Sequence, residues 1–107
     1  MPYLKRLVEG DLQEKLAASG AVLIKGPKSC GKTETATQYA KSVLRMDRDP
    51  QVPVIMATHP QLLLRGETPR LLDEWQEQPE IWNYVRHEVD HRKSKGQFIL
   101  TGSANPP

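Results

Sequence analysis

One octapeptide limits what this chain can fold into more than any other part of its sequence. It fits the pattern G-x-x-x-x-G-K-[ST] at every fixed position and consists of Gly26, Pro27, Lys28, Ser29, Cys30, Gly31, Lys32 and Thr33. The continuous apolar run at 21–24 precedes it, which predicts a strand buried on both faces of a sheet. Good helix formers follow from Lys32 to about Leu44. The sequence therefore predicts a strand, a glycine-bounded loop and a helix in succession.

The chemistry of such a loop is the binding of phosphate groups. Its glycines allow successive backbone N–H groups to point at phosphate oxygens, and the N-terminus of the following helix favours an anion. Lys32 can reach the β- and γ-phosphates of a nucleotide, and the Thr33 hydroxyl can bind Mg²⁺. We therefore expect ATP and Mg²⁺ as ligands, with nucleotide contacts from Gly26 through Glu34. A chance glycine-rich turn is the alternative, and the flanking strand and helix favour the phosphate loop.

A pair of acids, Asp73 and Glu74, directly follows two leucines. A carboxylate that leaves the tip of a strand beside a phosphate loop can hold Mg²⁺, which is the role expected for Asp73. Glu74 would then act as the general base that polarises the attacking water. Two acids after two leucines also occur at helix caps and surface turns. The strand and helix pattern that follows favours the functional interpretation.

Polar residues also end the last apolar run of the chain. The run 98–100 is predicted to be a strand, and Thr101, Gly102 and Ser103 follow it. In P-loop ATPases a polar side chain at this place contacts the γ-phosphate and helps to position water. Thr101 and Ser103 are candidates for that role. The other interpretation, a strand that ends at a glycine turn, stays equally open.

The order of the predicted elements indicates the fold class. Helices are expected where apolar residues recur every three or four positions, at 4–16 and at 79–95. Further strands are expected at 52–56, where Pro53 indicates a sheet edge, and at 70–72, with a helical turn at 60–64. Strands that alternate with helices predict a three-layer α/β fold, a P-loop NTPase core with a mostly parallel sheet. Ligands of such sheets bind at the carboxyl ends of the strands.

The loop, the segment Leu-Leu-Asp-Glu-Trp-Gln and the segment Phe-Ile-Leu-Thr-Gly-Ser together resemble one group of AAA-type ATPases of bacteria and archaea. Members of this group have an N-terminal AAA domain followed by a C-terminal domain similar to restriction-endonuclease folds. The resemblance runs from about Tyr3 to Pro106. It implies ATP hydrolysis at a site made of Lys32, Thr33, Asp73, Glu74 and, as alternative sensors of the γ-phosphate, Thr101 and Ser103.

The same resemblance implies that the domain is partial. The chain stops just after the last predicted strand, so we expect residues 1–107 to form a single AAA domain truncated before the helical lid. A fifth strand and an arginine finger would also be missing. ATPases of this kind build their active sites between subunits, which implies a homo-oligomer and hydrolysis in the full-length context. The main alternative is a nucleotide-binding interaction module without independent hydrolysis.

The segment 87–91 matches a different signature, H-E-x-x-H, which is typical of zinc peptidases. His87 and His91 would share one face of the predicted helix, and Glu88 would be the general base. However, no His, Asp, Glu or Cys follows this segment to supply a third ligand, and no pattern specifies His59 for that role. A zinc peptidase is therefore a remote alternative, and adventitious metal binding is the simpler interpretation.

Length and charge limit the remaining classes. The 107 residues leave room for one domain, and a net charge of +2 permits nucleic-acid binding without indicating it. A single cysteine excludes an internal disulfide and fits a reducing compartment. No segment approaches the roughly 18 consecutive apolar residues of a membrane span. We expect a cytoplasmic protein that has no membrane partner.

Overall fold

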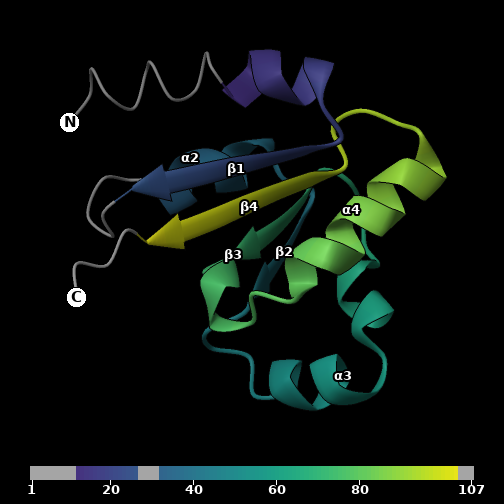
Figure 1. Ribbon diagram of the computed structural model, residues 1–107. Coiled ribbons are helices and arrows are strands. Elements are labelled where there is room, and N and C mark those ends of the chain that lie inside the picture. The colour runs from purple at the N-terminus through teal and green to yellow at the C-terminus, as the bar shows by residue number, and fades with distance from the viewer. Residues whose placement is uncertain (1–11, 27–31, 104–107) are drawn as a thin grey trace.

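The computed structural model describes residues 12–26 and 32–103, which form a four-stranded sheet with helices on both faces (Figure 1). All neighbouring strands are parallel, and their order across the sheet is β1-β4-β3-β2. The strands are β1 (Ala21–Gly26), β2 (Ser42–Arg45), β3 (Arg70–Asp73) and β4 (Phe98–Ser103). The predicted α/β class and parallel sheet are confirmed.

Helical segments connect the strands and cover the sheet. They are residues 12–18, α2 (Lys32–Tyr39), α3 (Val52–Thr58), the 3₁₀ helices η2 (Pro60–Leu64) and η3 (Trp75–Glu77), and α4 (Ile81–Arg92). The segment 12–18 and α2 pack on one face, whereas α3, η2 and α4 pack on the other, which makes three layers. Among the helices that the structure describes, none combines the length and the apolar character needed to cross a membrane.

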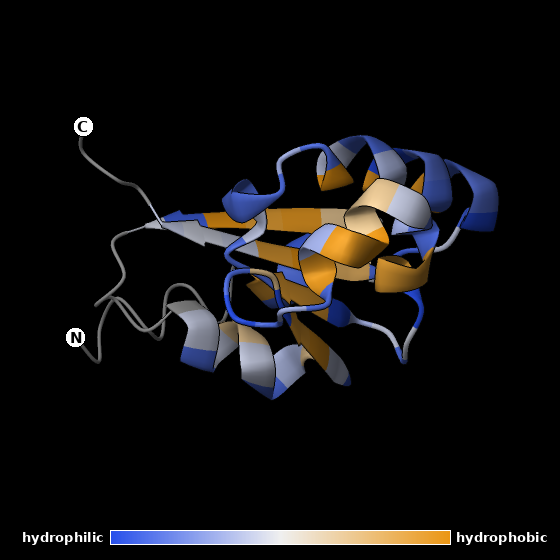
Figure 2. Ribbon diagram, turned by 90° about the horizontal axis from the view of Figure 1, so that it is seen from below, coloured by the Kyte–Doolittle hydropathy of each residue, from blue (hydrophilic) through white to orange (hydrophobic). Residues whose placement is uncertain are grey.

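Two hydrophobic clusters, one on each face of the sheet, hold these layers together. Alternate strand residues supply them, because successive side chains of a strand point to opposite faces. The cluster on the α2 face contains Leu12, Leu16, Val22, Ala36, Leu71 and Ile99. The cluster on the α4 face includes Leu44, Val52, Leu64, Leu72, Ile81, Val85, Phe98 and Leu100. Figure 2 shows the apolar strands lying between the layers of helices.

The helix predicted at 32–44 is wrong in its second half. Helix α2 ends at Tyr39, and residues 42–45 form β2 instead. Within β2 only Leu44 is buried, and Val43 is 38% exposed. One buried residue makes too short an alternation for a strand to be recognised in the sequence. Pairing with β3, which is a tertiary contact, decides the conformation here.

The edge strand predicted at 52–56 is also wrong, because these residues begin helix α3. Pro53 lies in the first turn, where proline costs no hydrogen bond since those N–H groups have no partner within the helix. Val52 is buried, and Ile55 and Met56 pack against the same cluster three and four positions later. This spacing is helical, but a short apolar run does not distinguish a helix from a strand.

Strand β1 is less buried than its sequence predicts. It pairs with β4 alone among the described strands, so it lies at an edge of the described sheet. Val22 is buried, whereas Leu23 and Ile24 are half-buried and pack against opposite clusters. Both faces of β1 are therefore covered, as expected, but its outer edge lowers the burial.

Helix α4 confirms the predicted helix at 79–95, although it begins only at Ile81. Its core-facing residues are Ile81, Val85 and Val89. Trp82 packs against the same cluster, with its ring centroid 6.1 Å from that of Trp75 in η3. These contacts dock α4 beside the end of β3, where the candidate site lies.

Candidate nucleotide-binding site

The carboxyl ends of the strands bring the predicted polar residues together. Because the sheet is parallel, Arg45, Asp73 and Thr101 are Cα partners in one row across β2, β3 and β4. Gly26 and Ser103 are partners between β1 and β4. Leu71 and Ile99, two positions before Asp73 and Thr101, belong to the cluster on the α2 face. The row around Asp73 therefore faces the N-terminal end of α2.

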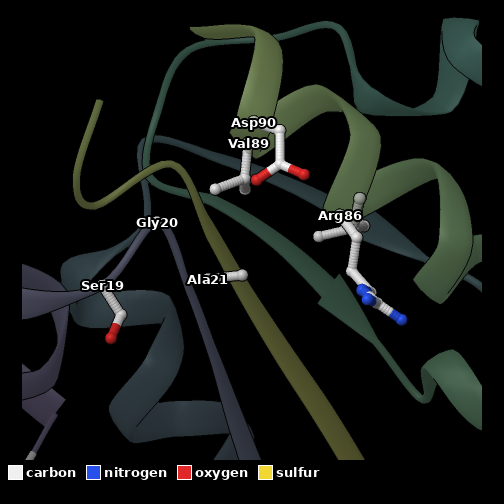
Figure 3. A pocket seen from close by; sticks show the side chains of 7 residues that line it. Ser19, Gly20, Ala21, Arg86, Val89 and Asp90 are labelled. Carbon is white, nitrogen blue, oxygen red and sulfur yellow. The ribbon is translucent and has the colours of Figure 1, made fainter. Parts of the chain in front are cut away.

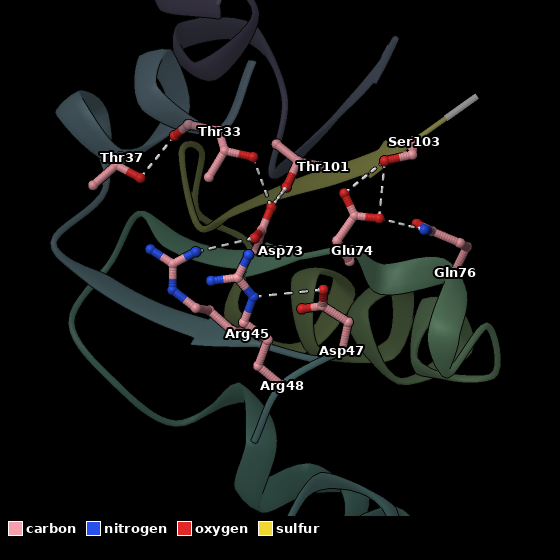
Figure 4. Close-up of polar contacts among 10 residues, drawn as sticks. All are labelled: Thr33, Thr37, Arg45, Asp47, Arg48, Asp73, Glu74, Gln76, Thr101 and Ser103. Atoms are coloured by element: carbon pink, nitrogen blue, oxygen red, sulfur yellow. Dashed lines mark hydrogen bonds and ion pairs between the residues drawn. The ribbon is translucent and has the colours of Figure 1, made fainter. Parts of the chain in front are cut away.

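Asp73 is the centre of this row (Figure 4). It is 4% exposed, and its Oδ1 accepts hydrogen bonds from Thr33 Oγ1 at 3.0 Å and from Thr101 Oγ1 at 2.6 Å. Its Oδ2 lies 3.4 Å from Nη1 of Arg45. A carboxylate and a threonine hydroxyl are the hard oxygen donors that Mg²⁺ prefers in proteins. The donor set at Thr33 and Asp73 therefore fits a divalent cation.

Glu74 leaves the strand in a left-handed backbone conformation, with φ 57° and ψ 50°. This region costs a non-glycine residue roughly 1–3 kcal/mol, so the surrounding contacts must hold it there. The Ser103 hydroxyl lies 2.7 Å from Oε1 and 3.0 Å from Oε2, and Nε2 of Gln76 donates to Oε2. Glu74 is 6% exposed. Its carboxylate is thus fixed at the same edge of the sheet as that of Asp73.

Two residues of this network, Arg45 and Gln76, receive no role from the sequence. Arg45 ends a strand that the sequence does not reveal. Gln76 belongs to the segment Leu-Leu-Asp-Glu-Trp-Gln, but no local pattern shows that its amide turns back to Glu74. The corner is tight, because a Cβ added at Gly102 would lie 2.9 Å from Oε1 of Gln76. That oxygen is buried and has no hydrogen-bond partner in the structure as described.

The central residues of the predicted phosphate loop, Pro27, Lys28, Ser29, Cys30 and Gly31, lie outside the described residues. Both flanks of the loop are described. Gly26 is the last residue of β1, and Lys32 is the first residue of α2, although its side chain also lies outside the description. Glu34 is exposed in the first turn of α2. The strand before the loop and the helix after it are therefore confirmed.

A hollow of about 250 Å³ lies at the opposite end of β1 (Figure 3). Residues 19–21 line one side of it, and Arg86, Val89 and Asp90 of α4 line the other. The length of β1 separates this hollow from Gly26 and the phosphate loop. It is therefore not part of the candidate site.

The H-E-x-x-H segment lies on α4, as predicted, but Glu88, its candidate general base, has another partner. His87 and His91 are exposed, and Oε2 of Glu88 lies 2.7 Å from Nε of Arg92. Within residues 12–26 and 32–103, no three His, Cys, Asp or Glu side chains gather where they could hold a metal ion. This part of the chain supplies no third ligand for the histidine pair.

A family model described as an AAA domain matches residues 18–106. The match spans all four strands and every candidate site residue. The chain belongs to this AAA domain family. Membership confirms the resemblance to AAA-type ATPases and makes the chain a P-loop domain of a nucleotide-binding class.

Two curated proteins, both named as uncharacterized, are similar to this AAA domain. One is from Mycobacterium bovis and the other from Mycobacterium tuberculosis, and each is 31% identical over 98 residues. The match covers 89% of this chain but only 22% of each relative. The chain thus spans about a fifth of the length of these relatives. No solved structure matches the chain significantly.

Proposed function

We propose that this AAA domain binds ATP together with Mg²⁺ and, in its full-length context, hydrolyses the bond between the β- and γ-phosphates. The observation that carries the proposal is the 3.0 Å hydrogen bond between Thr33 Oγ1 and Asp73 Oδ1. It joins the helix that follows the phosphate loop to the carboxyl end of β3. A hydroxyl and a carboxylate joined in this way support a cation site beside the phosphates.

Four residues carry the proposed chemistry. Lys32 and the backbone N–H groups of the loop stabilise the negative charge of the transferring phosphoryl group. Thr33 and Asp73 hold Mg²⁺, which neutralises phosphate charge when it is bound. Glu74 orients the attacking water and accepts its proton as the water approaches in line with the leaving oxygen.

The two hydroxyls at the end of β4 have different proposed roles. Thr101 orients Asp73 through the 2.6 Å hydrogen bond. Ser103 holds Glu74, with 2.7 Å between its Oγ and Oε1 of the carboxylate. Ser103 is also the partner of Gly26 in the strand register, which supports it over Thr101 as the contact to the γ-phosphate.

A nucleotide-binding module that switches conformation without hydrolysis is the second candidate function. Both carboxylate oxygens of Glu74 accept hydrogen bonds from protein donors, namely Ser103 and Gln76. These donors compete with an attacking water for the same carboxylate oxygens, which favours binding without turnover. The first candidate includes assembly of several copies through the AAA domain, whereas the second requires none. Both candidates share the nucleotide site and differ in turnover.

Titration with a fluorescent ATP analogue, with and without Mg²⁺, tests the shared site. We expect Mg²⁺-assisted binding by the unmodified chain and loss of tight binding in Lys32→Ala, because this lysine contacts the β- and γ-phosphates. Lys41→Ala is the matched control, since Lys41 is exposed just beyond the other end of α2. Circular dichroism would verify that both variants fold. Equal affinity in Lys32→Ala and Lys41→Ala would contradict the proposed site.

A further inference from the structure

The positively charged Arg45 lies beside the carboxylate of Asp73, the proposed ligand of Mg²⁺. It ends β2 beside Asp73 in the strand register, and its Nη1 lies 3.4 Å from Oδ2. The other carboxylate oxygen, Oδ1, already accepts hydrogen bonds from Thr33 and Thr101. A cation that approaches Oδ2 therefore meets the guanidinium (Figure 4).

The two partners of this ion pair differ in burial and in the number of their other hydrogen bonds. The Asp73 side chain is 6% exposed and is tied to two hydroxyls, whereas the Arg45 side chain is 44% exposed. A long, half-exposed arginine loses little when it swings into water, because exposed ion pairs contribute little to stability. Asp73 cannot follow it without breaking its other hydrogen bonds. The guanidinium is therefore the replaceable partner.

We propose that Arg45 is the counter-ion of Asp73 in the metal-free domain and that a divalent cation displaces it, so Arg45 raises the metal concentration at which the site fills. This inference rests on the metal site of the proposed function. Two positive charges beside one carboxylate repel each other, and partial burial strengthens the repulsion. Arg45 thus tunes metal affinity without being a ligand or a base.

Binding of Mn²⁺ in the absence of nucleotide, followed by electron paramagnetic resonance, tests this proposal without any turnover. Arg45→Gln removes the positive charge and keeps a side chain of similar reach. We expect the dissociation constant for Mn²⁺ to fall by about three- to tenfold. High salt should shrink the difference between this variant and the unmodified chain, because salt screens the repulsion.

Arg48→Gln is the matched control. Arg48 follows the same strand end, its side chain is 73% exposed, and it pairs with Asp47 at 3.9 Å instead of with Asp73 (Figure 4). The Mn²⁺ affinity of the Arg48→Gln variant should equal that of the unmodified chain. Asp73→Asn should remove the binding, and Mn²⁺ binding that survives this change would overturn the proposal, because the metal would then bind elsewhere.

Two further results would contradict the role of Arg45. Unchanged Mn²⁺ affinity in Arg45→Gln would show that the two cations do not compete, and weaker affinity would show that Arg45 orients Asp73 for the metal. In the unmodified chain, Mg²⁺ should shift the nuclear magnetic resonance signals of the Arg45 guanidinium and leave those of Arg48 in place. The absence of that shift at saturating Mg²⁺ would also overturn the proposal. Loss of ATP-analogue binding alone would count against the proposed function and leave these metal measurements intact.

Discussion

The two ends of the sheet are both rich in polar contacts, but they are built from opposite charges. At the carboxyl end, the buried carboxylates of Asp73 and Glu74 accept hydrogen bonds from side chains. At the amino end, Arg70 and Arg92 donate hydrogen bonds, and Nε of Arg70 lies 2.7 Å from the carbonyl oxygen of Leu63. Negatively charged acceptors are buried at the carboxyl end, and positively charged donors lie at the amino end.

At the amino end, the arginines already have partners within the protein. Nη1 of Arg70 also donates to Ser42 Oγ at 3.1 Å, and a Cβ added at Gly66 would lie 2.6 Å from that nitrogen. Burial lowers the pKa of Arg70 because desolvation disfavours its charged form, yet an arginine stays charged at neutral pH. Arg92 lies over the Phe98 ring, 5.1 Å from the centroid. Both guanidinium groups are thus engaged by partners within the protein.

The carboxylate end can exchange its partners. The hydroxyl hydrogens of Thr33 and Thr101 can rotate, and the half-exposed Arg45 can move into water. Asp73 can then replace a protein contact with a cation while its backbone stays in place. We therefore expect substitutions at the carboxyl end to change ligand binding and turnover, and substitutions at the amino end to change stability.

The largest effect should come from Glu74→Gln. Turnover of MgATP should fall by about 100-fold or more, because an amide cannot accept the proton of the attacking water. Nucleotide affinity should change little, since glutamine keeps the size of glutamate and can still accept from Ser103. Phosphate release measured beside analogue titration checks both expectations. Undiminished turnover would assign the base elsewhere, and no turnover by the unmodified full-length protein would favour the binding module.

A smaller effect, on stability, is expected from Arg70→Met. The Leu63 carbonyl and the Ser42 hydroxyl would lose a charged donor, which should lower the free energy of unfolding by about 2 kcal/mol. Urea denaturation measures this loss, and Arg65→Met at an exposed neighbouring position is the control. Nucleotide affinity should stay the same. Reduced affinity in a folded Arg70→Met would show that the amino end of the sheet also affects ligand binding.

The smallest effect is expected from Arg92→Met, which keeps an apolar stem on α4. It removes the 2.7 Å ion pair with Glu88, the 3.0 Å hydrogen bond to Oε1 of Gln97 and the cation–π contact with Phe98. Because these side chains are part-exposed, their net contribution should be about 1 kcal/mol. Thermal unfolding measures the change, with Arg86→Met at an exposed position of the same helix as the control. Equal stability of the two variants would show that the contacts of Arg92 add nothing measurable.

Segments with several buried residues could be predicted from the sequence. Phe98, Ile99 and Leu100 are fully buried in β4, and Ile81 and Val85 are fully buried in α4, so their spacing carries a clear signal. The segments at 42–45 and 52–56 could not be predicted. Each has a single buried residue, which is too weak a pattern to indicate a helix or a strand. Tertiary pairing and packing then determine the secondary structure.

The candidate site divides in a similar way. Asp73, Glu74, Thr101 and Ser103 could be placed together because each follows an apolar run that forms a strand, and parallel strands end at one edge. Their individual roles remain predictions. The position of Arg45 beside Asp73 could not be predicted, because no sequence pattern indicates the strand β2 that Arg45 ends.

Three features of this domain are visible in its amino-acid order alone: the phosphate-loop pattern, the alternation of strands with helices, and the polar residues at the ends of β3 and β4. Two others depend on the folded chain: β2 pairs with β3, which places Arg45 beside Asp73, and Gln76 turns back to Glu74. Local patterns record which residues prefer burial, whereas contacts between distant residues depend on strand register and side-chain direction. Those arise only when the sheet assembles.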